Sequence, residues 1–296
     1  MGTVKLTERE LCPPKSFRLV TMKECMPWLG CKEISNEVTV LGKIGEGNLK
    51  TVYLATWRDY TVAYSNLTNV RHFISSFQHD VEMLRKLQYS SHVVTLVGSC
   101  NTTFLTELHR LGSTNNIETI FKRRDFSKLN NVRTRFNLSL SFVEAIHFLH
   151  NSPIGTLVIC DSQDLKKTLS QYLVTEDFNL VANDLDSLRE VNSKEKLFIR
   201  CRQRQLRPGF VSPEELWPFE NETFDGSRLP YYDEKTDIWK ILNVVNYLLG
   251  NVNGSDVVRS HLFKVHQQCQ DRDPKQRPNA KVVLDEYKRV RNLLFP

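Results

Sequence analysis

The hydrophobic pattern of this chain changes near residue 112, and that change constrains the fold more than any other feature of the sequence. Up to that point, short stretches alternate apolar and polar residues or are rich in β-branched and aromatic residues, as strands are. One longer segment, HFISSFQHDVEMLRKLQ, instead carries apolar residues at helical spacing. The strand-like segments are EVTVLGKIG, TVYLATW, TVAYSNL, VVTLVGSC and TFLTELH.

Beyond residue 112 the periodic segments are long and helical. They are RTRFNLSLSFVEAIHFLH, KTDIWKILNVVNYLLG, DVVRSHLFKVHQQCQ and NAKVVLDEYKRVRNLL. A strand-rich half followed by a helix-rich half predicts an α+β, bilobal fold, with a small β-rich N-lobe that has one main helix and a larger, mainly α-helical C-lobe. Ligands commonly bind between two such lobes. We predict a Cys-rich N-terminal extension at residues 1–37, the N-lobe at 38–112 and the C-lobe at 113–296.

The composition is that of a globular protein, with 40% hydrophobic and 25% charged residues. The net charge of +6 combines both signs, with basic clusters at 122–124 and 200–207. Such clusters are usually solvated surface, and because no aromatic-rich RNA-binding motif accompanies them we predict no nucleic-acid partner. The sequence contains no run of about 18 apolar residues that could span a membrane, and its first residues lack the apolar region of a signal peptide.

Cysteines and sequons nevertheless favour the secretory pathway. Three of the seven cysteines lie in CPPKSFRLVTMKECMPWLGC, a loop-rich stretch that disulfides would stabilise. Free buried thiols are the alternative, whereas no CxxC or HxxxH spacing supports zinc; because seven is an odd number, at least one thiol stays unpaired. Five Asn-X-Ser/Thr sequons are also present, at Asn66, Asn101, Asn137, Asn221 and Asn253.

The segment IGEGNLKTV lies between two predicted strands and contains Gly45 and Gly47. It resembles the glycine-rich loop of the protein-kinase superfamily, in which backbone N–H groups cover the nucleotide phosphates and a valine, here Val52, packs on adenine. Lys50 replaces the third glycine of that pattern. Glycines at a strand-to-turn junction can also serve the backbone alone.

Three later blocks extend this resemblance to a protein-kinase-like fold over residues 38–292. FVSPEELWP is similar to the family's APE element, DEKTDIWKILNVVNYLLG to its central buried helix, and DPKQRPNAKVVL to its closing arginine segment. The resemblance implies that Glu214 and Arg277 form a buried structural ion pair. It also implies that Asp237 braces the catalytic loop.

Two metal ligands follow from the same comparison. The metal-binding aspartate of the family matches Asp184 in the segment LVANDLD. The usual offset of 13 residues back to the metal-binding asparagine reaches Gln171, which keeps a neutral carbonyl ligand on a longer side chain. Alternatively, Gln171 only caps a strand.

The catalytic aspartate has two candidates. The segment IGTLVICDSQDLKKTLSQYLV contains no HRD, and the usual offset of five before Gln171 falls on Lys166, which cannot act as a base, so an insertion is needed. Asp161 follows the strand-like LVIC and is preferred, while Asp164 begins a DLK that mimics the common motif. In either case the carboxylate would accept or orient the acceptor hydroxyl during transfer of the γ-phosphoryl group.

The usual nucleotide-binding lysine is missing, because Ser65 stands in its place. Side chains alternate along a strand, so Lys50 shares a face with Val52, and Ser65 shares one with Ala63, which would line the adenine pocket. Kinases of the with-no-lysine type resemble this arrangement, which implies that Lys50 reaches the phosphates from the neighbouring strand. The alternative is a solvated hairpin lysine.

A carboxylate partner for Lys50 is expected on the helix HDVEMLRKLQ. The family pattern places Asp80 at the position that usually holds a glutamate. Glu82 is two residues further on and therefore about 200° around the helix. We predict that Asp80 is the partner.

The combined motifs point to a narrower group. The segments CMPWLGC, IGEGNLKTVYLATW, ICDSQDLKKTLSQYLV, ANDLDSL and YDEKTDIWK resemble the protein O-mannose kinases, and the likeness extends from about Cys12 to the end. It implies an enzyme that uses ATP and Mg²⁺, or Mn²⁺, to phosphorylate the 6-hydroxyl of O-linked mannose in a GalNAc–GlcNAc–mannose trisaccharide on α-dystroglycan. It also implies the endoplasmic reticulum lumen and a type II single-pass membrane protein in full-length form, with its N-terminal anchor absent from this chain.

Two other functions stay open from the sequence. A pseudokinase scaffold would explain the departures at Ser65, at Gln171 and at the missing HRD. An ordinary protein Ser/Thr or Tyr kinase would differ in its acceptor. The region 186–232, with Arg200, Arg202 and Arg204, lies where a kinase meets its acceptor, and we expect this basic segment to contribute to a sugar site.

Overall fold

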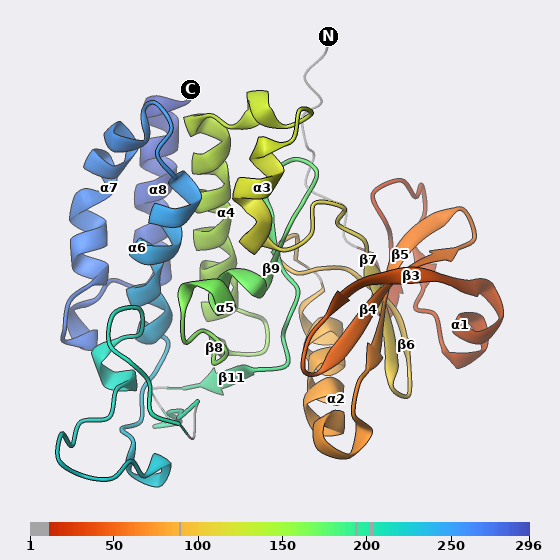
Figure 1. Cartoon of the computed structure of the whole chain (residues 1–296), viewed down its shortest axis with the longest axis horizontal. Coiled ribbons are helices and arrows are strands. Elements are labelled where there is room, and N and C mark those ends of the chain that lie inside the picture. Colours follow the sequence, from red (N-terminus) through yellow and green to blue (C-terminus); the bar gives the residue numbers. More distant parts are fainter. Residues whose placement is uncertain (1–11, 89, 193–194, 202–203) are drawn as a thin grey trace. The chain divides into compact units, whose positions relative to one another are not determined.

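The computed structural model describes residues 12–88, 90–192, 195–201 and 204–296. The chain divides into two compact units, Met1–His109 and Arg110–Pro296 (Figure 1). The first unit is built around a β-sheet and the second mainly from helices, which confirms the predicted fold class.

The sheet of the first unit has five antiparallel strands in the order β3-β4-β5-β7-β6. One main helix, α2 (Val70–Leu87), buries its apolar face in this unit, and the ring of Phe77 lies 5.2 Å from that of Phe104 on β7. The periodicity of the sequence therefore identified both the strands and the helix. The strands are β3 (Val38–Glu46), β4 (Lys50–Trp57), β5 (Tyr60–Leu67), β6 (Leu96–Cys100) and β7 (Thr103–Glu107).

The segment that precedes the sheet belongs to the core of the first unit. It forms a short hairpin, β1 (Ser16–Phe17) with β2 (Met26–Pro27), and the helix α1 (Cys31–Glu37). The ring of Phe17 packs 5.5 Å from that of Trp57 on β4. Leu29 pairs with β6 at Gly98, where an added Cβ would meet the Leu29 carbonyl oxygen at 2.4 Å, so only glycine fits there.

The prediction of disulfides is confirmed. Six cysteines form the pairs Cys12–Cys25, Cys31–Cys100 and Cys160–Cys201. The second pair joins α1 to β6, and the third joins two segments of the second unit. Cys269 is the free cysteine; it is buried, and burial raises the pKa of its thiol to about 12 although Arg277 and Lys235 oppose the shift.

The second unit is a helical bundle with two small β-pairs. Helix α4 is buried on most sides, and the ring of Phe136 on α4 stacks 6.0 Å from Tyr287 on α8. In Figure 1, α4, α6, α7 and α8 run side by side. The α-helices are α3 (Ile117–Lys122), α4 (Val132–His150), α5 (Leu165–Ser170), α6 (Lys235–Leu249), α7 (Ser255–Cys269) and α8 (Ala280–Leu294).

Short elements connect and complete this bundle. The antiparallel pairs are β8 (Thr156–Ile159) with β11 (Leu188–Val191), and β9 (Tyr172–Val174) with β10 (Leu180–Ala182). The single-turn 3₁₀ helices are η1 (Thr114–Asn116), η2 (Ser127–Leu129), η3 (Pro213–Glu215), η4 (Gly226–Arg228) and η5 (Pro274–Gln276). Within the described ranges, no helix combines the length and the apolar character needed to cross a membrane.

Side-chain caps fix where several of these helices begin. The side chains of Asn131 and Asn279 accept hydrogen bonds from backbone N–H groups in the first turns of α4 and α8. Asp164 does the same for α5. Such caps satisfy N–H groups that have no partner inside the helix, so they set the start of each helix and of the loop before it.

Candidate active site

Lys50 begins β4, and its ammonium is held inside the first unit. Its Nζ donates to Asp80 Oδ2 on α2 at 2.6 Å and lies 5.1 Å from the centre of the Phe104 ring. Lys50 is 9% exposed and Asp80 is fully buried. The predicted partnership of Lys50 with Asp80 is confirmed, and Lys50 is not a solvated hairpin residue.

The pairing of the strands accounts for the position of Lys50. The turn between β3 and β4 is closed by a hydrogen bond from the Gly47 N–H to the Lys50 carbonyl at 2.9 Å, and Gly45 pairs with Val52. On the next strand, Ser65 pairs directly with Val52 and is 3% exposed. Lys50 and Ser65 therefore lie on the same face of the sheet, on neighbouring strands, and the small serine leaves room there for the Lys50 side chain.

The sequence also singled out two neighbouring residues, Ala63 and Glu82, and the part of Ala63 in an adenine pocket stays a prediction. Ala63 is buried on β5 opposite Leu54. Glu82 lies on the exposed side of α2, where its Oε1 is 2.6 Å from Lys86 Nζ, and the hydrogen bond with Lys86 lowers the pKa of the Glu82 carboxyl group. Glu82 is thus turned away from Lys50, as the helical spacing predicts.

In the second unit, two predicted carboxylates share one ammonium. Lys167 Nζ lies 2.5 Å from Asp161 Oδ2 and 3.8 Å from Asp184 Oδ2. Burial lowers the pKa of Lys167, but the hydrogen bond with Asp161 and the charges of Asp184, Asp161 and Asp186 outweigh it, and the net shift is upward. Lys167 therefore stays protonated and offsets part of the negative charge that collects here.

Asp164, the alternative catalytic residue, has a structural task. Its Oδ1 accepts a hydrogen bond from the Lys167 N–H at 2.7 Å and caps α5. Helix α5 occupies most of the stretch between Asp161 and Gln171, where the spacing required extra residues. This geometry favours Asp161 over Asp164 as the carboxylate that faces Asp184, while the catalytic role stays a prediction.

The side-chain amide oxygen of Gln171 is buried and accepts no hydrogen bond from the described residues. The residue is 2% exposed, and its Nε2 donates to the Lys167 carbonyl at 3.2 Å. Its Oε1 has no hydrogen-bond partner among the described residues. The Gln171 backbone carbonyl accepts from the N–H of Asn183 at 2.8 Å and of Asp184 at 3.4 Å, which holds the two predicted metal ligands together. An amide oxygen without a partner among the described residues and the nearby carboxylate residue Asp184 are oxygen ligands of the kind that Mg²⁺ prefers.

The predicted structural residues take the expected places. Arg277 binds Glu214 through two hydrogen bonds of 2.5 and 2.8 Å. Asp237, on α6, accepts from the Ile159 N–H at 3.2 Å and contacts His150 Nε2 at 3.2 Å. Because Ile159 lies two residues before Asp161, Asp237 braces the loop that carries the predicted catalytic carboxylate, and both predictions are confirmed.

The basic segment is described only in part. The guanidinium of Arg200 lies 3.8 Å from the centre of the Tyr231 ring, and its Nη1 donates to the Ser227 carbonyl at 2.6 Å. Arg204 is exposed, and Arg202 lies outside the described residues. Its contribution to a sugar site stays a prediction.

Sequence reasoning missed Lys167. The segment QDLKKT contains two adjacent lysines, and the offset rule drew attention to Lys166, one position away from the residue that contacts Asp161 and Asp184. Helical direction could have found it. In a helix that starts after Asp164, the side chains of the first turn tilt toward the N-terminus, so both Lys166 and Lys167 become candidates to reach back toward Asp161.

The lysine–aspartate pair of the first unit and the two carboxylates after short strands of the second unit are residue types that phosphotransferases of the protein-kinase class use. A family model described as the protein-kinase domain of FAM69 matches residues 73–205. The chain is 45% identical to protein O-mannose kinase from Homo sapiens over 286 residues, 96% of this chain and 81% of that protein. It is 46% identical to the Gallus gallus protein of the same name over 291 residues, or 97% and 82%. The Xenopus laevis protein O-mannose kinase shares 45% identity over 292 residues, or 98% and 82%. The chain belongs to the protein O-mannose kinase family.

Proposed function

We propose that this chain transfers the γ-phosphoryl group of ATP to the 6-hydroxyl of O-linked mannose, within a GalNAc–GlcNAc–mannose trisaccharide on α-dystroglycan. The observation that carries the proposal is the buried pair of Lys50 with Asp80. The pair provides a buried lysine on β4 although position 65 holds a serine, and this supports an active enzyme over an inactive scaffold. Family membership supports mannose as the acceptor.

Each residue has a distinct part in the proposed reaction. Lys50, oriented by Asp80, donates hydrogen bonds to the nucleotide phosphates, and backbone N–H groups near Gly45 and Gly47 cover them. Asp161 orients the mannose hydroxyl and accepts its proton as the oxygen attacks the γ-phosphorus, while the bond from that phosphorus to the β–γ bridging oxygen breaks and ADP leaves. Lys167 holds Asp161 in place and offsets its charge.

Asp184 and Gln171 would hold the metal ion, through a carboxylate oxygen and the orphaned amide oxygen. Bound Mg²⁺, or Mn²⁺, supplies positive charge that offsets the charge of the phosphate oxygens. Two protein ligands suffice, since Mg²⁺ usually keeps waters and substrate phosphates in its remaining positions.

The acceptor test separates this function from its rivals. Purified protein is offered radiolabelled ATP with either the mannose trisaccharide or generic protein substrates, with Mg²⁺ or Mn²⁺ present. We expect label on the trisaccharide and none above background on the proteins. Label on the proteins alone would favour a Ser/Thr or Tyr kinase, and the absence of both transfer and nucleotide-induced thermal stabilisation would favour a pseudokinase scaffold.

We also place the enzyme in the lumen of the endoplasmic reticulum, as a type II single-pass membrane protein in full-length form. Three disulfides support an oxidising compartment. Sequon exposure gives a test. The exposed sequon residues are Asn101, Asn221 and Asn253, whereas Asn66 on β5 and Asn137 on α4 are partly buried.

Mass spectrometry of protein secreted from animal cells is expected to find glycans at the three exposed asparagines. Asn66 is expected to stay unmodified, because its Oδ1 accepts a hydrogen bond from Thr103 at 3.2 Å. Reduced cysteines together with empty sequons would contradict the lumenal location.

A further inference from the structure

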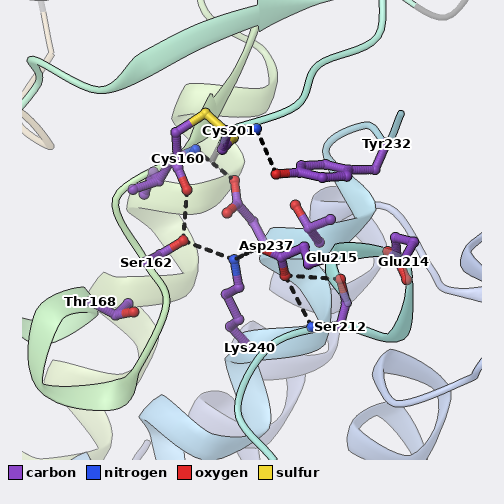
Figure 2. A network of polar contacts seen from close by, with 12 residues as sticks. Cys160, Ser162, Thr168, Cys201, Ser212, Glu214, Glu215, Tyr232, Asp237 and Lys240 are labelled. Atoms are coloured by element: carbon purple, nitrogen blue, oxygen red, sulfur yellow. Dashed lines mark hydrogen bonds and ion pairs between the residues drawn. A yellow bond between two sulfur atoms is a disulfide. The ribbon is translucent and has the colours of Figure 1, made fainter. Parts of the chain in front are cut away.

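The ammonium of Lys240 is buried at the centre of the second unit. Lys240 lies on α6 and is 2% exposed. Its Nζ donates to Ser162 Oγ at 2.8 Å and to Glu215 Oε1 at 3.0 Å. Figure 2 shows this lysine between the two residues, so that it joins two segments far apart in the sequence.

One end of this network reaches the loop of Asp161. Ser162, the residue after Asp161, donates its hydroxyl to the Ile159 carbonyl at 2.6 Å and accepts from Lys240. Asp237, almost one turn before Lys240 on α6, accepts from the Ile159 N–H at 3.2 Å. Helix α6 therefore fixes both backbone polar groups of Ile159, directly through Asp237 and through Ser162 by way of Lys240.

The other end reaches the segment in which we expect the acceptor to bind. Glu215 Oε2 accepts from the Ser212 N–H at 3.0 Å and from Ser212 Oγ at 2.9 Å. This closes the single turn η3, within the region 186–232. The disulfide between Cys160 and Cys201, drawn in Figure 2, also joins this loop to the region 186–232. In the sequence Cys160 comes directly before Asp161, as Ser162 comes directly after it.

Stability alone does not account for such an arrangement. Burying a lysine and a glutamate costs solvation energy, and well-packed apolar residues of similar volume often stabilise a protein at least as well. The two charged groups instead fix the geometry of their neighbours. The Lys240 ammonium donates to the Ser162 hydroxyl, and Glu215 Oε2 accepts from the Ser212 N–H and hydroxyl.

We propose that Lys240 is a positioning residue that sets the place of Asp161 relative to the acceptor segment, acting through Ser162 on one side and Glu215 on the other. The inference rests on the proposed function of Asp161. Because Lys240 contacts both Ser162 and Glu215, the conformation of residues 212–215 is coupled to the conformation of the loop that carries Asp161.

The test removes both charges together. In the variant K240M/E215Q, the apolar methionine fills the space of the lysine stem, and the glutamine oxygen still accepts from Ser212. We expect kcat for transfer to the mannose trisaccharide to fall about 10-fold or more, because a misplacement of about 1 Å in a catalytic group can cost about 100-fold. The KM for ATP is expected to change less than about twofold, as the inference places no nucleotide contact at these residues.

Hydrogen exchange supplies a readout that does not depend on the substrate. The amides of Cys160–Gln163 are expected to exchange faster in K240M/E215Q than in the wild type, while those of α4 keep their protection. S162A is expected to act in the same direction, and its effect is expected not to add to that of K240M, because both changes break one chain of contacts.

The control is R135M/E118Q. Arg135 is likewise 2% exposed and lies 2.8 Å from a glutamate of the same unit, Glu118, whose side chain is 46% exposed, but among the described residues none of the contacts of Arg135 reaches either loop. The variant R135M/E118Q is expected to be less stable than the wild type, with an unchanged kcat and unchanged hydrogen exchange at Cys160–Gln163.

Wild-type kcat and loop exchange in K240M/E215Q would overturn the inference, as would an equal loss in the control. If the loop exchanges faster but the wild type does not phosphorylate mannose, the coupling stands and the proposed function alone fails.

Discussion

Lys50 and Asp80 form an ion pair in which the side chain of the aspartate is 0% exposed and that of the lysine 11%. A charge that is this well buried depends on its partner. The pair therefore has two separable consequences, one for folding and one for catalysis.

Removing one partner is expected to destabilise the protein more than removing both. D80L leaves the Lys50 ammonium without its carboxylate, and we expect a loss of about 3 kcal/mol in the free energy of unfolding. K50M/D80L is expected to recover most of that loss while transfer stays about 100-fold or more below the wild type, since a charged donor to the phosphates is gone. Urea denaturation and the transfer assay measure the two effects. Wild-type transfer in K50M/D80L would remove Lys50 from the nucleotide site.

The two candidate aspartates are expected to differ in kind. D161N keeps the shape of the side chain but cannot accept a proton, so transfer is expected to fall about 100- to 10,000-fold. Stabilisation by Mg-ATP in a thermal-shift assay is expected to persist. D164A removes the cap of α5 and is expected to cost about 1 kcal/mol with nearly normal transfer. The reverse pattern would assign the catalytic role to Asp164.

Gln171 is expected to contribute to metal binding through its Oε1, in addition to the hydrogen bond that its Nε2 donates to the Lys167 carbonyl at 3.2 Å. Because its Oε1 has no partner among the described residues, Q171A breaks no bond made by that oxygen. We expect the Mg²⁺ concentration for half-maximal transfer to rise about 10-fold, a cost of about 1.4 kcal/mol in metal binding. A control for the loss of a glutamine away from the site is Q268A, at an exposed position of α7. Equal metal titrations for Q171A and the wild type would reduce Gln171 to a structural residue at the end of α5.

Local sequence patterns predicted most of the fold, because the pattern that identifies a long amphipathic helix or a β-branched strand lies entirely within the residues of that one element. The contact of Lys50 with Asp80 also followed, since strand alternation and helical spacing each fix the direction of a side chain. The short α5 did not follow, and with it Lys167 was missed. The burial of Phe17 against Trp57 was also missed, because a loop-rich segment with few periodic residues gives no sign of the sheet it will cover.

His266 predicts a dependence of stability on pH. Burial lowers its pKa from 6.5 to about 4 in the folded protein, where its Nε2 lies 2.7 Å from the Tyr287 hydroxyl. The unfolded chain binds the proton more readily, so stability is fully present above pH 6.5 and is lost as the pH falls toward 4. The complete loss is about 3 kcal/mol, at 1.36 kcal/mol per pKa unit.

H266Q is expected to lack this loss while it keeps a polar partner for Tyr287. Urea denaturation measures the free energy of unfolding of H266Q and of the wild type at pH 7 and at pH 4. The difference between these two free energies is expected to become about 3 kcal/mol smaller at pH 4, because only the wild type loses stability from His266. H261Q, at a partly exposed position of the same helix, serves as the control. Parallel curves for H266Q and the wild type would contradict the prediction.

Cys269 carries the one free thiol among the cysteines of the described residues, so its reaction with a thiol reagent reports the opening of the segment that buries it. The thiolate is the reactive form of cysteine, and a buried thiol with a pKa of about 12 is almost entirely protonated at neutral pH. Each molecule that reacts with an aromatic disulfide reagent has first exposed the end of α7 to water. The rate of colour formation then measures how often this segment opens in the native population. The other described cysteines form disulfides and do not react with the reagent as free thiols.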